Sequence, residues 1–150
     1  DDHDRVLTLE LMHQILDRTT QPVDGTVNRV LDGPEIMEMR QVARSVPIAK
    51  PVQGYAIRLT LGSHPDSPYA TPLVKRYVRY GASPRAAQAL VLAGKVHALT
   101  RGNAFVAAED IRAVALPALR HRLLLNFEGE AEQINADTIV NELFGSVKAE

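Results

Sequence analysis

The sequence contains no cysteine, which excludes disulfides, thiolate metal ligands and a cysteine nucleophile. Aromatic residues make up only 5% of its 150 residues, and segments typical of strands are scarce. No apolar run approaches the ~20 residues that a membrane-spanning helix needs. These absences favour an all-α fold, a small helical bundle with at most a vestigial pair of short strands. We expect a cytoplasmic protein without a membrane partner.

Motifs that would complete a nucleotide site are also missing. No G-x-x-x-x-G-K-[ST] loop is present to hold a triphosphate, and no apolar strand ends in an acidic pair suited to Mg²⁺. We therefore expect this chain alone to bind ATP weakly or not at all and to hydrolyse none. The histidines show no spacing typical of zinc, so no metal site is predicted. They are His3, His13, His64, His97 and His121.

Several segments of the sequence carry apolar residues at helical spacing. Helices are predicted at 6–18, 51–61 and 84–100, and further helices should open at 32–35, 109–110 and 136–137. In the helix that opens at 32–35, we expect four residues to face inward: Ile36, Met39, Val42 and Ala43. Gly62 is expected to end its helix as a C-cap, and Pro117 to break or bend its helix.

A polar connector from Pro22 to Asp32, with the turn signal Asp24-Gly25, indicates two parts. Residues 1–30 are expected to form a leading helix and connector. Residues 31–150 are expected to form the helical domain.

The segment Gly81–Ala86, with the sequence GASPRA, is the most informative motif. Ser83 can cap a helix and Pro84 suits the first helical position. Arg85 then lies in the first turn, where the helix dipole and a planar guanidinium both favour a phosphate. The alternative is an ordinary capped helix with an incidental surface arginine.

The surroundings of this motif are strongly basic. No aspartate or glutamate occurs between Ser67 and Ala108, while six basic residues do: Lys75, Arg76, Arg79, Arg85, Lys95 and Arg101. Such a local excess needs an anionic ligand or compensating acids elsewhere. Glu35, Glu38 and Glu128 are candidates for the second explanation.

These motifs in this order resemble the C-terminal lid of MoxR-type AAA+ ATPases. The resemblance is carried by Gly81–Ala86 with its alanine-rich helix, by Phe105–Ile111, and by Arg120-His121-Arg122-Leu123. The segment Tyr55–Leu61 resembles the preceding helix of that lid. The likeness extends from about Val30 to Leu125.

The resemblance implies a role for the motif and for the longer protein. Arg85 corresponds to the sensor 2 arginine, a catalytic residue that contacts the γ-phosphate of ATP, and Ser83 and Pro84 fix its helix start. ATP and Mg²⁺ would be cofactors of the complete protein. Partners would be an AAA+ core of the same chain, further copies in a ring, usually hexameric, and a von Willebrand factor A domain protein. The activity would be chaperone-like remodelling.

The sequence departs from the family pattern at three places. The Walker motifs, sensor 1 and arginine finger are expected upstream of Asp1. Ala108 occupies a position that is often serine or threonine, and the loop 63–71 lacks the usual Thr-Arg. Two other functions remain open, a nucleic-acid-binding module that uses the basic stretch 75–101 and a domain that docks an acidic protein. Few aromatic residues are available to stack on bases, which disfavours nucleic acid.

Overall fold

The computed structural model describes residues 8–20 and 28–149, and the chain divides into two compact units, Asp1–Gly33 and Pro34–Glu150. In the first unit, α1 spans Leu9–Thr20. It begins at Leu9 because Thr8 Oγ1 accepts a hydrogen bond from Leu11 N at 3.2 Å, as an N-cap does. Val6 and Leu7, predicted to start this helix, and Pro22–Gly25 of the connector lie outside the described residues.

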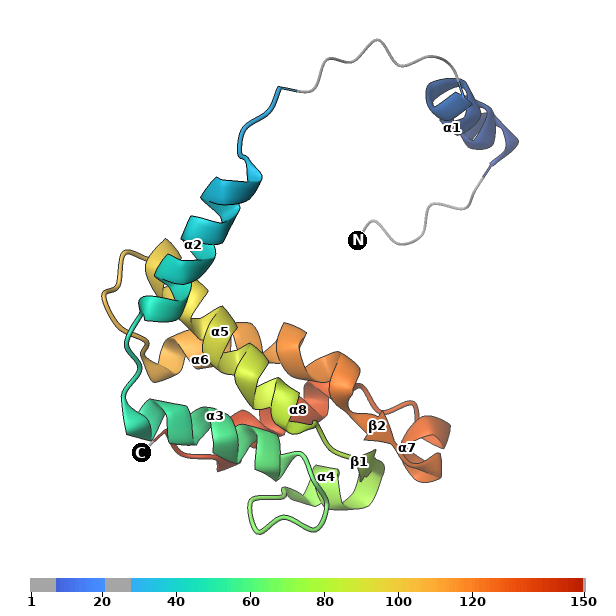
Figure 1. Cartoon of the computed structure of the whole chain (residues 1–150). Helices are drawn as coiled ribbons and strands as arrows, with labels where there is room; N and C mark the ends of the chain where they lie inside the picture. Colours follow the sequence, from blue (N-terminus) through green and yellow to red (C-terminus); the bar gives the residue numbers. More distant parts are fainter. Residues whose placement is uncertain (1–7, 21–27, 150) are drawn as a thin grey trace. The chain divides into compact units, whose positions relative to one another are not determined.

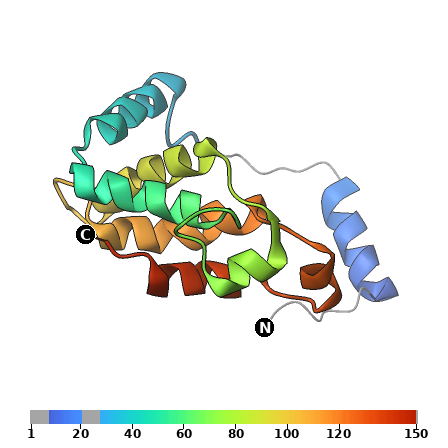
Figure 2. The same ribbon diagram turned by 90° about the horizontal axis from the view of Figure 1, so that it is seen from below.

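The second unit is built from four helices that pack side by side (Figures 1 and 2). They are α3 (Lys50–Gly62), α5 (Pro84–Thr100), α6 (Ala108–Leu119) and α8 (Ala136–Ser146). Their inner faces supply the core, which includes Tyr55, Leu59, Leu90, Ile111 and Leu143, all fully buried. Burying such side chains stabilises the fold by about 1.5–3 kcal/mol each.

Further elements complete this unit. They are α2 (Gly33–Ser45), α4 (Pro72–Tyr77), α7 (Phe127–Ala131) and a 3₁₀ turn at Arg120–Arg122. Strand β1 (Val78–Tyr80) pairs antiparallel with β2 (Leu124–Leu125). The described residues thus form eight α-helices and one small two-stranded sheet, which confirms the predicted all-α class with a vestigial strand pair.

Helices α5 and α6 approach closely because α5 contains a glycine at the contact. A β-carbon on Gly94 would lie 2.7 Å from Ile111 Cδ1. The two helices are joined by a left-handed turn at Gly102, whose φ is +75°. The Gly102 and Asn103 amides donate to the carbonyls of Leu99 and Ala98, both at 2.9 Å. The predicted end of this helix before Gly102 is therefore confirmed, and the glycine provides the conformation that the turn requires.

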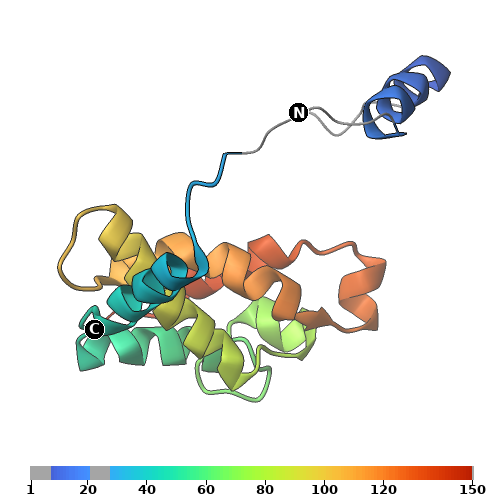
Figure 3. The same ribbon diagram turned by 45° about the horizontal axis from the view of Figure 1, so that its top comes forward.

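The prediction that α2 buries an apolar face is wrong within this structure. Ile36, Met39 and Val42 are about half exposed, and α2 has no buried residue. Figure 3 shows α2 lying beside α5, and Lys95 Nζ of α5 donates to the carbonyl of Arg44 at 2.7 Å. Leu99 of α5 lines the same shallow hollow as Met39 and Val42, so the apolar residues of α2 are only partly covered.

Two local predictions also need correction. Gly62 is the last residue of α3 rather than a left-handed C-cap, and the capping residue Ser63 has a φ of −75°. A β-carbon on Gly62 would lie 2.9 Å from Leu143 Cδ2, so packing between α3 and α8 requires the glycine. Pro117 does not break α6, which continues through it to Leu119.

Candidate functional site

The N-terminus of α5 is fixed rigidly to the end of α3. A β-carbon on Gly81 would lie 2.6 Å from Ser63 O and 2.7 Å from His64 Cγ, so only glycine fits. Ala82 is fully buried, and its amide donates to Ser63 Oγ at 2.8 Å. His64 Nε2 lies 2.9 Å from the Ala82 carbonyl oxygen. The first two residues of the motif therefore hold the helix start against a neighbouring turn.

Ser83 and Pro84 begin α5 where the sequence predicted, but Ser83 does not cap it through its side chain. Ser83 has extended backbone, with φ −67° and ψ 168°, and its hydroxyl makes no capping hydrogen bond. Its carbonyl oxygen instead accepts from Ala86 N at 2.8 Å. The helix start thus depends on backbone geometry and on Pro84, whose fixed φ suits the first helical position.

Arg85 is exposed in the first turn of α5, directly after this anchored start. It makes no hydrogen bond or ion pair with any other residue of the described ranges. The amide groups and dipole at a helix N-terminus favour negative charge, and the guanidinium adds a full positive charge. The position can therefore receive an anion such as a phosphate.

Part of the basic stretch is neutralised by acids elsewhere, as the alternative explanation predicted. Arg76 Nη2 lies 2.6 Å from Glu128 Oε1 and 2.9 Å from Glu132 Oε1, both carboxylates being contributed from the α7 region. The hydrogen bond with Glu128 raises the pKa of Arg76. Of the three acids that the sequence offered, Glu128 is confirmed as a partner of this basic stretch.

The same cluster includes a tyrosine that the sequence did not single out. Tyr77 donates its hydroxyl to Glu132 Oε2 at 2.7 Å, and this hydrogen bond raises the pKa of Tyr77. Arg76 also lies over the Tyr77 ring, 4.8 Å from its centroid. These contacts join α4 to α7, so Arg76 has a structural role and is not available as a free phosphate contact.

A second charged cluster joins α5 to α6. His97 Nδ1 lies 2.8 Å from Oδ1 of Asp110, whose side chain is fully buried, and Arg101 Nη1 lies 3.7 Å from the same oxygen. Ala107 N donates to Asp110 Oδ2 at 2.8 Å. Burial raises the pKa of Asp110, but the Ala107 amide, the His97 bond and the charges of His97 and Arg101 outweigh it and leave the pKa lowered.

Sequence reasoning missed the pairing of His97 with Asp110 because the two residues are thirteen positions apart. The available signal was Asp110 itself, an acid at the third position of a helix where a carboxylate can reach back to the capping residue. Nothing local indicated that His97 would meet it. His3 lies outside the described residues, and His13, His64 and His121 have no part in this cluster.

The described ranges contain neither a candidate metal site nor a candidate membrane span. No group of three or more histidine, aspartate or glutamate side chains there is placed to hold a metal ion. No helix in those ranges has both the length and the apolar character to cross a membrane.

Three comparisons with known proteins agree with this arrangement. A family model described as an AAA lid domain matches residues 71–143, which include α4 through most of α8. Chaperone MoxR1 of Mycobacterium tuberculosis is 26% identical over 119 residues, which are 79% of this chain and 32% of MoxR1. The uncharacterized protein YeaC of Bacillus subtilis is 38% identical over 71 residues, which are 47% of this chain and 22% of YeaC.

A solved structure is also similar. The crystal structure of a "putative ATPase" from Cytophaga hutchinsonii superimposes with a TM-score of 0.77 at 28% identity, covering 95% of this chain and 44% of the other. The chain thus spans less than half of the length of each of these proteins. From the lid-domain match, the MoxR1 similarity and the shared fold, we conclude that the chain carries an AAA+ lid domain of the MoxR type.

Proposed function

We propose that Arg85 is the sensor 2 residue of a MoxR-like ATPase, which contacts the γ-phosphate of ATP bound by an AAA+ core. The observation that carries this proposal is the state of Arg85, an exposed arginine with no partner among the described residues. It follows a helix start that Gly81 and Ala82 hold in place. A preorganised cation of this kind stabilises charge on a phosphate without a cost of reorganisation.

The residues of the motif fit one part of a nucleotide site. Arg85 would contact a phosphate oxygen, and Ser83 and Pro84 would set the start of the helix that presents it. ATP and Mg²⁺ would be bound mainly by the core, since Gly81–Ala86 offers no carboxylate to a metal ion. This chain alone is therefore expected to bind ATP weakly and to have no ATPase activity.

We base the proposed activity of the complete protein on its relatives. The name of MoxR1 describes a chaperone, which supports a remodelling ATPase whose lid transmits movement as ATP is hydrolysed. The lid would pack against AAA+ cores in a ring, usually a hexamer. A von Willebrand factor A domain protein would be a partner.

The test is the substitution Arg85→Ala in the complete protein, with steady-state ATP hydrolysis as the measurement. We expect turnover to fall by about tenfold or more, because a charge-assisted contact to the reacting phosphate is lost. Arg85→Lys should restore turnover only in part, since an ammonium cannot replace the bidentate fork.

Arg79→Ala is the matched control. Arg79 is an exposed arginine six residues upstream, and it lies over the Tyr80 ring rather than beside a carboxylate. We expect this variant to retain turnover within about twofold, as a surface substitution usually does. Wild-type turnover and ATP affinity in Arg85→Ala would overturn the assignment.

A further inference from the structure

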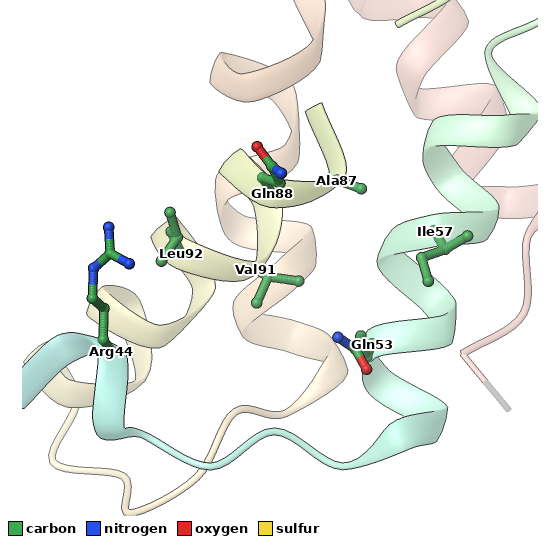
Figure 4. A pocket seen from close by; sticks show the side chains of 7 residues that line it. All are labelled: Arg44, Gln53, Ile57, Ala87, Gln88, Val91 and Leu92. Atoms are coloured by element: carbon green, nitrogen blue, oxygen red, sulfur yellow. The ribbon is translucent and has the colours of Figure 1, made fainter. Parts of the chain in front are cut away.

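The end of α3 meets the start of α5. The two helices lie side by side, with Ile57 of α3 and Ala87 of α5 lining one pocket of about 500 Å³ between them (Figure 4). At the end of α3, Nε2 of His64 lies 2.9 Å from the carbonyl oxygen of Ala82. Because a carbonyl oxygen only accepts hydrogen bonds, Nε2 carries the proton and donates it. The imidazole thus fixes the peptide group that joins Ala82 to Ser83.

Ser63, the residue before His64, holds the other side of Ala82. Ser63 is fully buried, and its hydroxyl accepts a hydrogen bond from the Ala82 amide at 2.8 Å and donates one to the Thr60 carbonyl at 2.6 Å. The peptide groups on both sides of Ala82 are therefore bonded to consecutive residues of one turn. Because a hydrogen bond weakens steeply as its angle departs from linearity, the two bonds together restrict the rotation of both peptide planes.

The turn that carries His64 is itself fixed. His64 N donates to the Leu61 carbonyl, and the His64 carbonyl accepts from Ser67 N, both at 3.0 Å. Gly81 packs against the same turn, where a β-carbon would lie 2.7 Å from His64 Cγ. The imidazole therefore acts from a fixed base when it bonds the start of α5.

Arg85 lies three residues after Ala82, in the first turn of α5. Pro84 has a fixed φ, and Ala86 N donates to the Ser83 carbonyl at 2.8 Å, so this turn is stiff. A change in direction at Ala82 is therefore passed on to the Arg85 side chain and is not absorbed before it.

We propose that His64 is a positioning residue for Arg85. Its bond to Ala82 sets the direction of the first turn of α5 and so the place of the guanidinium. This role rests on the proposed function of Arg85 and adds no contact with ATP. Misplacing a stabilising group by about 1 Å can lower a rate by about 10²-fold, so one hydrogen bond at this place matters to turnover.

The first measurement uses this chain without nucleotide. Amide hydrogen exchange, followed by NMR, is read at the amides of Ala82 and Ala86, which bond to Ser63 Oγ and to the Ser83 carbonyl. His64→Phe keeps a ring of similar shape but has no donor, and it should speed exchange at both amides by about fivefold or more. His64→Gln should keep exchange within about twofold of wild type, because its side-chain amide can donate to the Ala82 carbonyl. Unchanged exchange in His64→Phe, or equally fast exchange in both variants, overturns the proposal.

Asn135→Ala is the matched control for lost stability. Asn135 accepts a hydrogen bond from Asp137 N at 2.8 Å at the start of α8, so this variant also removes one bond between a side chain and the backbone at a helix start. It should leave exchange at Ala82 and Ala86, and turnover of the complete protein, within about twofold of wild type. Thermal unfolding of each variant gives its loss of stability, so that variants of equal stability are compared.

The second measurement is steady-state ATP hydrolysis by the complete protein. His64→Phe should lower kcat by about fivefold or more and change KM for ATP by less than about twofold, because the core provides most of the binding. Added to Arg85→Ala, it should lower kcat no further, since a residue that acts through Arg85 then has nothing to position. Wild-type kcat in His64→Phe, or a further loss in the double variant, contradicts this role and leaves the role of Arg85 intact. Wild-type turnover in Arg85→Ala contradicts the proposed function itself, and the role of His64 with it.

Discussion

The imidazole of His97 and the buried carboxylate of Asp110 are joined at 2.8 Å between Nδ1 and Oδ1, which links α5 to α6. Oδ2 of the same carboxylate accepts from the Ala107 amide at the start of α6. One fully buried acid thus serves as both a helix cap and a tertiary contact. Because an unpaired buried polar group is costly, the fold depends on both bonds being present.

Asp110→Ala is expected to destabilise the domain. The substitution leaves the Ala107 amide and His97 without their partner, and it opens space in the contact between α5 and α6. The loss should be about 1–3 kcal/mol in the free energy of unfolding, measured by urea denaturation. Glu109→Ala is the control, since Glu109 is an exposed acid in the same first turn, and its effect should stay within about 0.5 kcal/mol. Equal effects of the two variants would show that the buried bonds contribute nothing.

Stability should also fall in acid through Asp110. Its pKa in the folded protein is lowered, so the unfolded chain binds the proton more readily. The stability contribution is therefore complete above the ordinary aspartate pKa of about 4 and is lost as pH falls through the lower folded pKa. Urea denaturation from pH 7 downward should show the wild type losing stability below about pH 4 more steeply than Asp110→Asn. Parallel curves for the two proteins would contradict this expectation.

Two glycine substitutions should have effects of opposite sign. Gly81→Ala places a β-carbon 2.6 Å from the Ser63 carbonyl oxygen, which must move, and should destabilise the domain by about 1–3 kcal/mol. Gly145→Ala meets no atom within 4 Å in α8 and should stabilise it by about 0.5–1 kcal/mol, because alanine favours the helix. Thermal unfolding of both variants gives the comparison. A neutral Gly81→Ala would mean that the start of α5 is less firmly held than its contacts indicate.

Local chemistry made several elements predictable. The start of α5 at Pro84 and its end before Gly102 follow from the conformations that proline and glycine prefer, and the structure confirms both. The same holds for α8, which begins at the predicted Ala136 with Asn135 as its cap. The short helix α7 was not predicted, because its five residues are too few to show a helical period.

The site could be predicted only in part, because the sequence does not show which of its basic residues pair with acids. The sequence identified Arg85 and the surrounding positive charge, and it left open whether acids elsewhere would compensate. Arg76 meets Glu128 across fifty-two residues of sequence, and Arg101 meets the buried Asp110, so these cations are occupied while Arg85 has no partner among the described residues. Sequence spacing could not separate these cases, because long-range ion pairs depend on how helices pack.

The sequence by itself determined the helical class, the start and end of α5, and the placing of an arginine in its first turn. These depend on the backbone preferences of neighbouring residues, which act without the rest of the chain. Only the tertiary structure decided that Gly81 is required by the Ser63 carbonyl, that His97 meets Asp110, and that the apolar residues of α2 stay exposed. Each of these outcomes depends on which surface another helix brings into contact, and no local propensity encodes that.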